Sequence, residues 1–314
     1  MMIYLDFEKP VAALEARILE LQAATQESDI DADVEIAKLR GKADKQLADT
    51  YANLTAWQKT QVARHPERPH FKHYIASMFE DFMPLAGDRA FGDDQAIIGG
   101  LARLHGRRVM VIGHEKGDDT QSRLRHNFGM GKPEGYRKAI RLMELADRFA
   151  IPVVSLVDTS GAFPGIQAEE RGQAEAIARS TEACLALGVP MIACIVGEGG
   201  SGGAVALAAA DRILMFQYAV YSVISPEGCA SILWRTGDKA ADAAQAMKMT
   251  ADDLKSLRII DRIVKEPVGG AHRDHALAAA TLASAIHEEL EALSAFSSKE
   301  LLQQRRAKFL AMGA

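Results

Sequence analysis

The sequence predicts an α/β protein, because apolar strands and amphipathic helices alternate through the middle of the chain. Three continuous apolar runs have the length and composition of strands covered on both faces: residues 151–158, 189–196 and 212–216. Helical patterns accompany them at residues 135–149, 168–187 and 201–210. This order predicts parallel strands joined by right-handed crossovers, with helices on both faces of the sheet.

Further elements flank this region. Residues 10–63 carry apolar residues at spacings of three and four, with a polar break at residues 28–33, which predicts a helical hairpin. Its polar outer faces leave open whether it packs on the main body or on a partner chain. A short helix is expected around residues 74–82, and a β-hairpin over residues 96–104 and 109–113. After residue 226 the chain is mostly helical, with a strand-like run at 259–264 and a helical tail at 275–311 that we expect to be a packing arm.

Composition and charge exclude several classes of protein. The 314 residues, 48% of them hydrophobic, suffice for one large core or two smaller ones. The net charge of -5 gives no general positive field for a polyanion, so nucleic-acid binding is not expected. The first residues, MMIYLDFEKP, do not read as a signal peptide, and no apolar run is long enough to span a bilayer. We therefore expect a cytoplasmic protein.

The cysteines and histidines form no metal motif in the sequence. Cys184, Cys194 and Cys229 lie in apolar or glycine-flanked contexts without a CxxC spacing, which indicates packing roles in a reducing compartment. His70 and His73 have a spacing that metal ligands use, but no acidic or cysteine partner lies near them in the sequence. We expect solvent-facing histidines there and no metal on this chain.

Two glycine-rich loops follow predicted strands: DTSGAFPG at residues 158–165 and GEGGSGGA at residues 197–204. Glycine leaves main-chain N–H groups unobstructed, and the second loop also opens a helix, whose amino end favours negative charge. Paired amides of this kind suit an oxyanion or an enolate. The candidates are Gly199 and Gly200, with Gly161 and Ala162 as second donors. The alternative is that both loops are only tight turns.

Two short motifs in the second loop offer other functions. Gly197, Gly199 and Gly202 satisfy GxGxxG, but the next strand is not followed by an acid that could hold a ribose. Ser201 satisfies GxSxG, yet the histidines after it, His272, His275 and His287, lie in or near a polar helical region. A helix cap or a turn is the competing role for Ser201.

A group of basic residues is the third candidate site. Its members are Arg123, Arg125, Lys132, Arg137, Lys138 and Arg141. Such a group grips phosphates or an acidic carrier domain, or simply forms a solvated helix face, and the sequence leaves both readings open.

Three longer segments resemble one family. They are residues 158–179 (DTSGAFPGIQAEERGQAEAIAR), 195–204 (IVGEGGSGGA) and 221–234 (YSVISPEGCASILW), with support from residues 85–104, 126–143 and 266–273. From LDFEKP near the start to the helical tail, the chain resembles the carboxyltransferase alpha subunit of bacterial acetyl-CoA carboxylase. Ser160 and Phe163 depart from this family, which usually has proline and tyrosine there. These changes free the loop and remove a hydroxyl, whereas main-chain roles survive both.

The resemblance implies a crotonase-like fold, a superhelix of ββα turns with an N-terminal helical hairpin and a C-terminal helical arm. The implied parts are a helical extension at 1–85, a carboxyltransferase core at 86–270 and the arm at 271–314. Also implied by the family is an active site between chains, in which the amides of Gly199 and Gly200 serve biotin and the beta chain serves the acyl-CoA. Substrate-binding roles then fall on Phe163, Pro164, Gly165, Ser201 and Gly202.

The implied activity is that of a transferase that works only with a beta subunit, in an assembly of two alpha and two beta chains. It moves a carboxyl group from carboxybiotin, on a biotin carboxyl carrier protein, to acetyl-CoA and forms malonyl-CoA for fatty-acid biosynthesis. No cofactor is expected to bind this chain tightly, since biotin arrives as a carrier-bound substrate. Zinc belongs to the beta subunit, and ATP and Mg²⁺ to the separate biotin carboxylase.

Overall fold

The protein, seen here as a computed structural model, is built on one mixed sheet, and the structure describes residues 3–27 and 32–313. The sheet has the order β1-β2-β3-β4-β5-β6-β8, with β7 paired to β5. The first three strands are antiparallel and the later pairings are parallel, which confirms the predicted β-hairpin and parallel core. The strands are β1 (Glu80–Pro84), β2 (Ile97–Leu104), β3 (Arg107–His114), β4 (Val153–Thr159), β5 (Met191–Gly200), β6 (Arg212–Phe216), β7 (Val220–Ser222) and β8 (Arg262–Val264).

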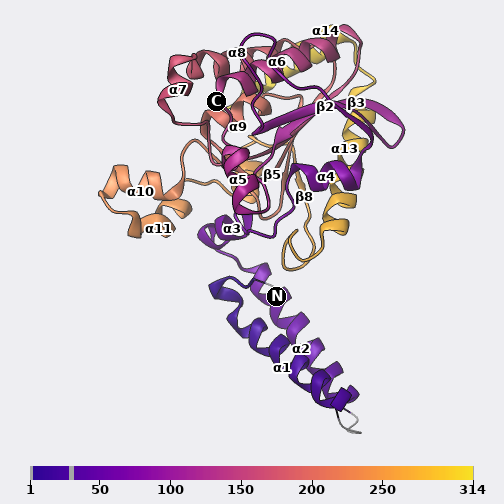
Figure 1. Cartoon of the computed structure of the whole chain (residues 1–314), viewed down its shortest axis with the longest axis vertical. Coiled ribbons are helices and arrows are strands. Elements are labelled where there is room, and N and C mark those ends of the chain that lie inside the picture. The colour runs from indigo at the N-terminus through magenta and orange to yellow at the C-terminus, as the bar shows by residue number, and fades with distance from the viewer. Residues whose placement is uncertain (1–2, 28–31, 314) are drawn as a thin grey trace.

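Helices surround the sheet and extend from it (Figure 1). They are α1 (Lys9–Glu27), α2 (Asp33–Ala52), α3 (Ala56–Ala63), α4 (Phe71–Met78), α5 (Thr120–Arg125), α6 (Pro133–Arg148), α7 (Ile166–Glu170), α8 (Gln173–Ala186), α9 (Ser201–Ala208), α10 (Pro226–Trp234), α11 (Ala240–Ala246), α12 (Ala251–Ser256), α13 (His275–Leu293) and α14 (Ser298–Leu310). Short 3-10 helices are η1 (Asp6–Glu8), η2 (Asn127–Gly129) and η3 (Gly237–Lys239).

Two glycines show that helices cover both faces of the sheet. Gly99 is in register with Ile112, so these two residues face the same side, and a Cβ at Gly99 would lie 2.5 Å from Leu142 of α6. Gly113 follows Ile112 and therefore faces the opposite side, where a Cβ would lie 2.4 Å from Phe71 of α4. Helices α6 and α4 thus pack on opposite faces, as the apolar strands predicted.

Three expected boundaries are wrong. The short helix expected to reach residue 82 ends at Met78, because residues 80–84 pair with β2 as an edge strand. The helix expected over 168–187 is interrupted at Gly172, whose φ of 78° is left-handed, so it forms α7 and α8. The strand-like run at 259–264 gives only the short β8, and β7 was not predicted at all.

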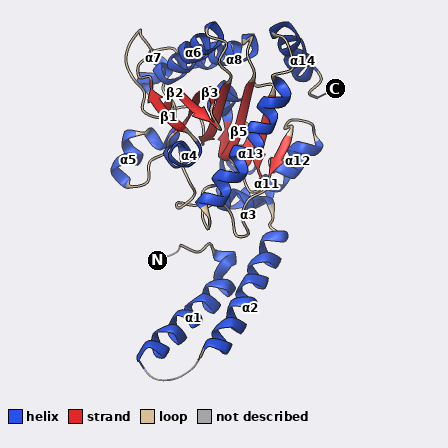
Figure 2. Cartoon of the chain, turned by 90° about the vertical axis from the view of Figure 1, so that its right-hand side faces the viewer, coloured by secondary structure: helices blue, strands red, loops and turns tan. Residues whose placement is uncertain are grey.

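The N-terminal helices form a hairpin that projects from the body (Figures 1 and 2). The polar break predicted at 28–33 falls largely on residues 28–31, which lie outside the described residues. At its base the hairpin packs on the body: Arg273 pairs with Glu8 at 3.3 Å, and the rings of Tyr51 and Tyr218 lie 5.3 Å apart. The Tyr51 hydroxyl also donates to Glu8 at 3.0 Å, which joins α2 to η1 at the start of α1. Packing on the main body is therefore confirmed at this end.

The helical tail packs as expected. Helix α13 buries Leu282, Ile286 and Leu290, and α14 buries Leu301 and Arg305. One buried apolar cluster runs from Phe71 to Leu301, so all three predicted parts contribute to it, and the limits 1–85, 86–270 and 271–314 stay a prediction. No helix in the described part of the chain combines the length and the apolar character needed to cross a bilayer.

Candidate active site

The two glycine loops meet where β4 and β5 end. Gly199 is in register with Thr159, and a Cβ at Gly200 would lie 2.3 Å from the carbonyl oxygen of Ser160. A Cβ at Gly203 would likewise lie 2.7 Å from the carbonyl carbon of Gly161. The loops therefore contact each other through main-chain atoms, and any side chain at these glycines would separate them. The structure brings the four predicted donor residues together.

The main-chain N–H groups of the first loop differ in whether they already have a hydrogen-bond acceptor. The N–H of Gly161 donates to the Thr159 hydroxyl at 3.1 Å, and this hydroxyl donates back to the Gly161 carbonyl at 2.7 Å. The N–H of Phe163 donates to the Gly131 carbonyl at 2.9 Å. Among the described residues, no acceptor takes the N–H of Ala162. Ala162 thus keeps an available N–H in this loop.

The second loop turns from strand to helix at Gly200. Gly199 and Gly200 are in register with Tyr221 and Ser222 of β7, and because successive N–H groups of a strand point to opposite sides, only one of the two faces β7. Helix α9 begins at Ser201, which has a left-handed φ of 55°, and Gly200 gives it no side-chain cap. Because first-turn amides have no acceptor within their own helix, the amino end of α9 offers donors beside Ala162. We call residues 199–202 the glycine turn.

The remaining predicted substrate-binding residues lie along the first loop. The Phe163 ring lies 5.1 Å from the Lys132 ammonium, and its carbonyl accepts from Gln173 at 3.0 Å. Pro164 is exposed, and a Cβ at Gly165 would lie 2.2 Å from the Phe163 ring. These contacts make the loop a closely packed turn in which the Phe163 side chain already has neighbours.

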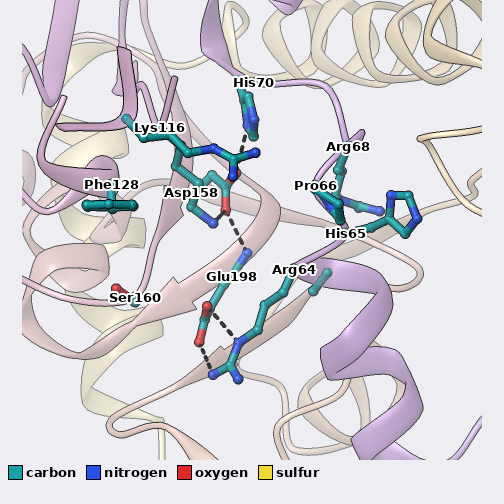
Figure 3. Close-up of a pocket in the computed structure, with 12 residues that line it drawn as sticks. Arg64, His65, Pro66, Arg68, His70, Lys116, Phe128, Asp158, Ser160 and Glu198 are labelled. Atoms are coloured by element: carbon teal, nitrogen blue, oxygen red, sulfur yellow. Dashed lines mark hydrogen bonds and ion pairs between the residues drawn. The ribbon is translucent and has the colours of Figure 1, made fainter. Parts of the chain in front are cut away.

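A cavity of about 240 Å³ lies beside the loops (Figure 3). Its lining comprises Ala63, Arg64, His65, Pro66, Arg68, His70, Lys116, Arg123, Phe128, Asp158, Ser160 and Glu198. Ser160 joins the cavity to the glycine turn, because its carbonyl oxygen is the group that approaches Gly200. Most of the other lining residues were not singled out from the sequence.

Asp158 is the buried charge at the centre of this cavity. Its carboxylate pairs with Lys116 at 2.6 Å and accepts the N–H of Glu198 at 2.9 Å. Burial alone would raise its pKa, but the Lys116 ammonium and His70 outweigh this and hold the pKa well below the usual range. Asp158 therefore stays ionised and orients Lys116.

Two arginines from the predicted N-terminal extension complete the charge pattern. Arg64 binds Glu198 at 2.7 and 3.0 Å and reaches Glu227 of α10 at 2.6 Å. Arg68 is fully buried, binds Glu266 twice at 2.8 Å, and donates to the Val196 carbonyl at 2.8 Å. The Arg64 pair ties the segment after α3 to the end of β5, and the Arg68 pair ties it to the loop after β8.

The expectation for His70 and His73 is wrong in two respects. His70 is buried, because Phe71 of the same segment packs on Gly113 of β3. The loop before α5 also supplies the acid that the sequence seemed to lack: Asp118 lies 3.8 Å from His70 and 3.9 Å from His73. Within residues 3–27 and 32–313, no three or more His, Cys, Asp or Glu side chains are grouped so as to hold a metal ion.

The buried histidine His272 is expected to make the stability of the fold depend on pH. Its ring stacks on His65 at 3.8 Å, and burial, helped by His65 and nearby arginines, lowers its pKa to about 2. An unfolded histidine binds a proton near pH 6.5, so this site stabilises the fold above that pH and loses its contribution as the pH falls. We expect the free energy of unfolding to drop by up to about 1.4 kcal/mol per pH unit between pH 6.5 and 5 for this group.

Urea unfolding of wild type and His272→Asn across this pH range measures the effect. The slope of stability against pH should be shallower in the variant. Equal slopes in the two proteins would contradict the assignment.

The basic group resolves into two parts. Arg137, Lys138 and Arg141 on α6 bind Asp88, Asp93 and the carbonyls of residues 85–87, and Lys138 is buried. They fix the loop before β2 and are neither a solvated face nor a phosphate grip. Arg123 instead lines the cavity, and Arg125 is exposed on the same helix.

The burial of the three cysteines and the position of Ser201 bear on the roles expected for them. Cys184 and Cys194 are buried, as expected of packing residues, while Cys229 is half-buried, and all three are free thiols. Ser201 does not cap α9 with its side chain, so its role as a turn residue is the one that the structure supports.

The histidines after Ser201 are engaged elsewhere. His272 stacks on His65, and the His275 ring bonds the Glu67 carbonyl at 2.7 Å. His287 lies 5.2 Å from His105 at the β2–β3 turn. The described residues therefore give Ser201 no acid–histidine pair of the hydrolase type.

Comparisons with known proteins agree with this architecture. A family model described as "Acetyl co-enzyme A carboxylase carboxyltransferase-like" matches residues 4–313. The chain is 72% identical over 313 residues to a protein of Rhizorhabdus wittichii, and 68% identical over 313 residues to one of Zymomonas mobilis subsp. mobilis. Both alignments cover 100% of each chain, and both relatives are named acetyl-coenzyme A carboxylase carboxyl transferase subunit alpha.

Solved structures share the fold. The transcarboxylase 12S structure is similar with a TM-score of 0.55 at 22% identity, over 69% of this chain and 42% of that chain. The beta subunit of Pseudomonas aeruginosa geranyl-CoA carboxylase gives a TM-score of 0.55 at 16% identity, over 83% of this chain and 47% of that chain. These similarities confirm the predicted crotonase-like α/β class. On the full-length identities above, the chain belongs to the family of acetyl-coenzyme A carboxylase carboxyl transferase alpha subunits.

Proposed function

We propose that this chain forms the biotin half of a carboxyltransferase site, and that it moves a carboxyl group from carboxybiotin on a carrier protein to acetyl-CoA. The observation that carries this proposal is the meeting of the Ala162 amide and the glycine turn beside a charged cavity. Family membership supports the same reaction.

The chemistry requires donors for negative oxygen. The bond between the biotin nitrogen and the carboxyl carbon breaks, which leaves charge on the ureido oxygen. A methyl proton of acetyl-CoA passes to that nitrogen, and the resulting carbon nucleophile bonds to the carboxyl carbon to give malonyl-CoA. Main-chain amides fixed before the reaction each stabilise such an oxygen by about 3 kcal/mol. Gly199, Gly200 and the first turn of α9 supply them, with Ala162 as a second donor, and Gly200 also sets the close approach of the two loops.

No carboxylate of the cavity is suited to act as the base. Asp158 has a strongly lowered pKa, and Glu198 is held by two bonds from Arg64. Asp158 therefore holds a proton weakly, and the Glu198 carboxylate is already engaged by the Arg64 guanidinium. Proton transfer to biotin itself removes the need for a side-chain base.

The proposed site is incomplete without a second chain. We expect a beta subunit that carries the zinc cluster to supply the acyl-CoA half, in an α2β2 assembly, and the carrier protein and biotin carboxylase to work beside it in the cytoplasm. ATP and Mg²⁺ belong to the carboxylase step. The test is malonyl-CoA formation from acetyl-CoA and carboxybiotin: the purified chain alone should be inactive, and added beta subunit should restore turnover. Full activity of the lone chain would refute the half-site.

Ser201 separates this proposal from a serine hydrolase. Alanine keeps the same Cβ at the left-handed position, so Ser201→Ala should retain carboxyl transfer within about threefold, whereas loss of a nucleophile costs about 10⁴-fold or more. Initial rates of the reconstituted complex measure the difference. A loss of the larger size would favour the hydrolase chemistry.

A further inference from the structure

Three consecutive residues at the cavity rim have left-handed backbone angles. Their φ values are 46° for Asn127, 54° for Phe128 and 80° for Gly129. Asparagine and glycine adopt this region readily, but a bulky aromatic residue does so rarely. Strain of this kind persists only where the surroundings enforce it, and it concentrates at functional sites.

Contacts on both sides of Phe128 enforce this backbone. The buried His126 ring bonds the Gln95 carbonyl at 2.6 Å and Lys72 at 3.0 Å. On the other side, a Cβ at Gly129 would lie 3.0 Å from the carbonyl oxygen of Asp158, so the turn packs directly on the end of β4. The turn is thus fixed to the strand that carries the first glycine loop.

The enforced backbone presents the Phe128 ring to the cavity instead of burying it. Phe128 is 47% exposed as a residue, and it lines the cavity together with Lys116, Arg123 and Ser160. In Figure 3 the ring faces the space above Ser160, across from Arg64 and Glu198. The fold therefore holds an apolar, planar surface in a strained position beside the proposed oxyanion donors.

We propose that Phe128 is a positioning residue on which the planar ureido ring of biotin packs. This inference rests on the proposed function. A flat, uncharged ureido group and an apolar thioether ring fit an aromatic face, and the ionic groups of the cavity leave that face as its apolar wall. The ring then sets the distance from the ureido oxygen to the Ala162 amide and the glycine turn.

The test uses the complex of this chain with a beta subunit, assayed in reverse with malonyl-CoA and biocytin. Phe128→Ala should raise the KM for biocytin about tenfold or more and leave the KM for malonyl-CoA unchanged. Phe128→Trp, which retains a flat face, should stay within about threefold of wild type. Two exposed residues serve as controls: Leu124→Ala, on the adjacent α5, and Phe149→Ala, at the opposite end of the sheet near the start of β4.

A second measurement needs no activity. Phe128→Gly removes the left-handed penalty, so it should raise the Tm of the isolated chain while it weakens biocytin use in the complex. A lower Tm would overturn the strain argument.

Each of the remaining outcomes contradicts either this inference or the proposed function. An unchanged biocytin KM in Phe128→Ala overturns the inference, as does a change confined to malonyl-CoA, which would assign the ring to the acyl-CoA. Loss of beta-subunit binding would make Phe128 an interface residue and overturn it as well. An inactive wild-type complex would instead refute the proposed function, so the two failures are distinguishable.

Discussion

Replacement of Gly200 by valine is expected to reduce carboxyl transfer by the reconstituted complex at least about 10²-fold in kcat. A Cβ at this position would lie 2.3 Å from the Ser160 carbonyl oxygen and 2.9 Å from that of Thr159, so the first loop must move away. The displaced loop would move the Ala162 N–H away from the N–H groups at the start of α9. Fixed donors lose most of their effect when they are misplaced by an ångström.

Matched variants separate this effect from misfolding. Gly237→Val lies in open space on η3 and should leave kcat unchanged, and a Cβ at Gly202 would lie 3.4 Å from Ile177, so Gly202→Ala should be mild. Thermal unfolding and co-purification with the beta subunit establish whether Gly200→Val still folds and assembles. A folded, assembled and fully active Gly200→Val would exclude the loop as a site and would favour a non-catalytic scaffold.

Replacement of Arg305 by methionine is expected to lower the free energy of unfolding by about 3–5 kcal/mol. The guanidinium is fully buried, binds both oxygens of Asp211 at 2.9 and 2.7 Å, and donates to the carbonyls of Cys184, Leu187 and Val189. Methionine fills similar space but leaves the carboxylate and the carbonyls without these donors. Urea unfolding measures the loss.

The neighbouring residue provides the control. Arg306 is exposed on the same helix, so Arg306→Met should change the free energy of unfolding by less than about 0.5 kcal/mol. Adding Asp211→Asn to Arg305→Met should recover part of the loss, because it removes the uncompensated charge. Equal stabilities of Arg305→Met and Arg306→Met would contradict the buried pair.

The sheet and the meeting of the glycine loops could be predicted from local signals. Apolar runs at 151–158 and 189–196 identify strands covered on both faces, and parallel strands bring their carboxyl ends to one edge. The loops that follow them must then lie close together. Close approaches at Gly197, Gly200 and Gly203 are the physical reason for the density of glycine in the second loop.

The cavity could not be predicted from local signals, because its lining residues are far apart in the sequence and only the tertiary fold brings them together. Arg64 and Arg68 lie in a segment read as a helical extension, and they reach Glu198 and Glu266 more than 130 residues away. The only local signal was a pair of arginines among prolines, in RHPERP at residues 64–69. Phe128 shows a different limit, since Asn-Phe-Gly suggests a turn but not that phenylalanine itself adopts the left-handed conformation.

Arg64 links two regions that otherwise differ greatly in their packing. One end of its guanidinium holds Glu198 on the central strand, and the other reaches Glu227 on α10, the helix that stands out from the body in Figure 1. Helix α10 also exposes Ile232 and Leu233. The same guanidinium therefore compensates a carboxylate beside the reacting groups and anchors the arm that exposes these apolar side chains.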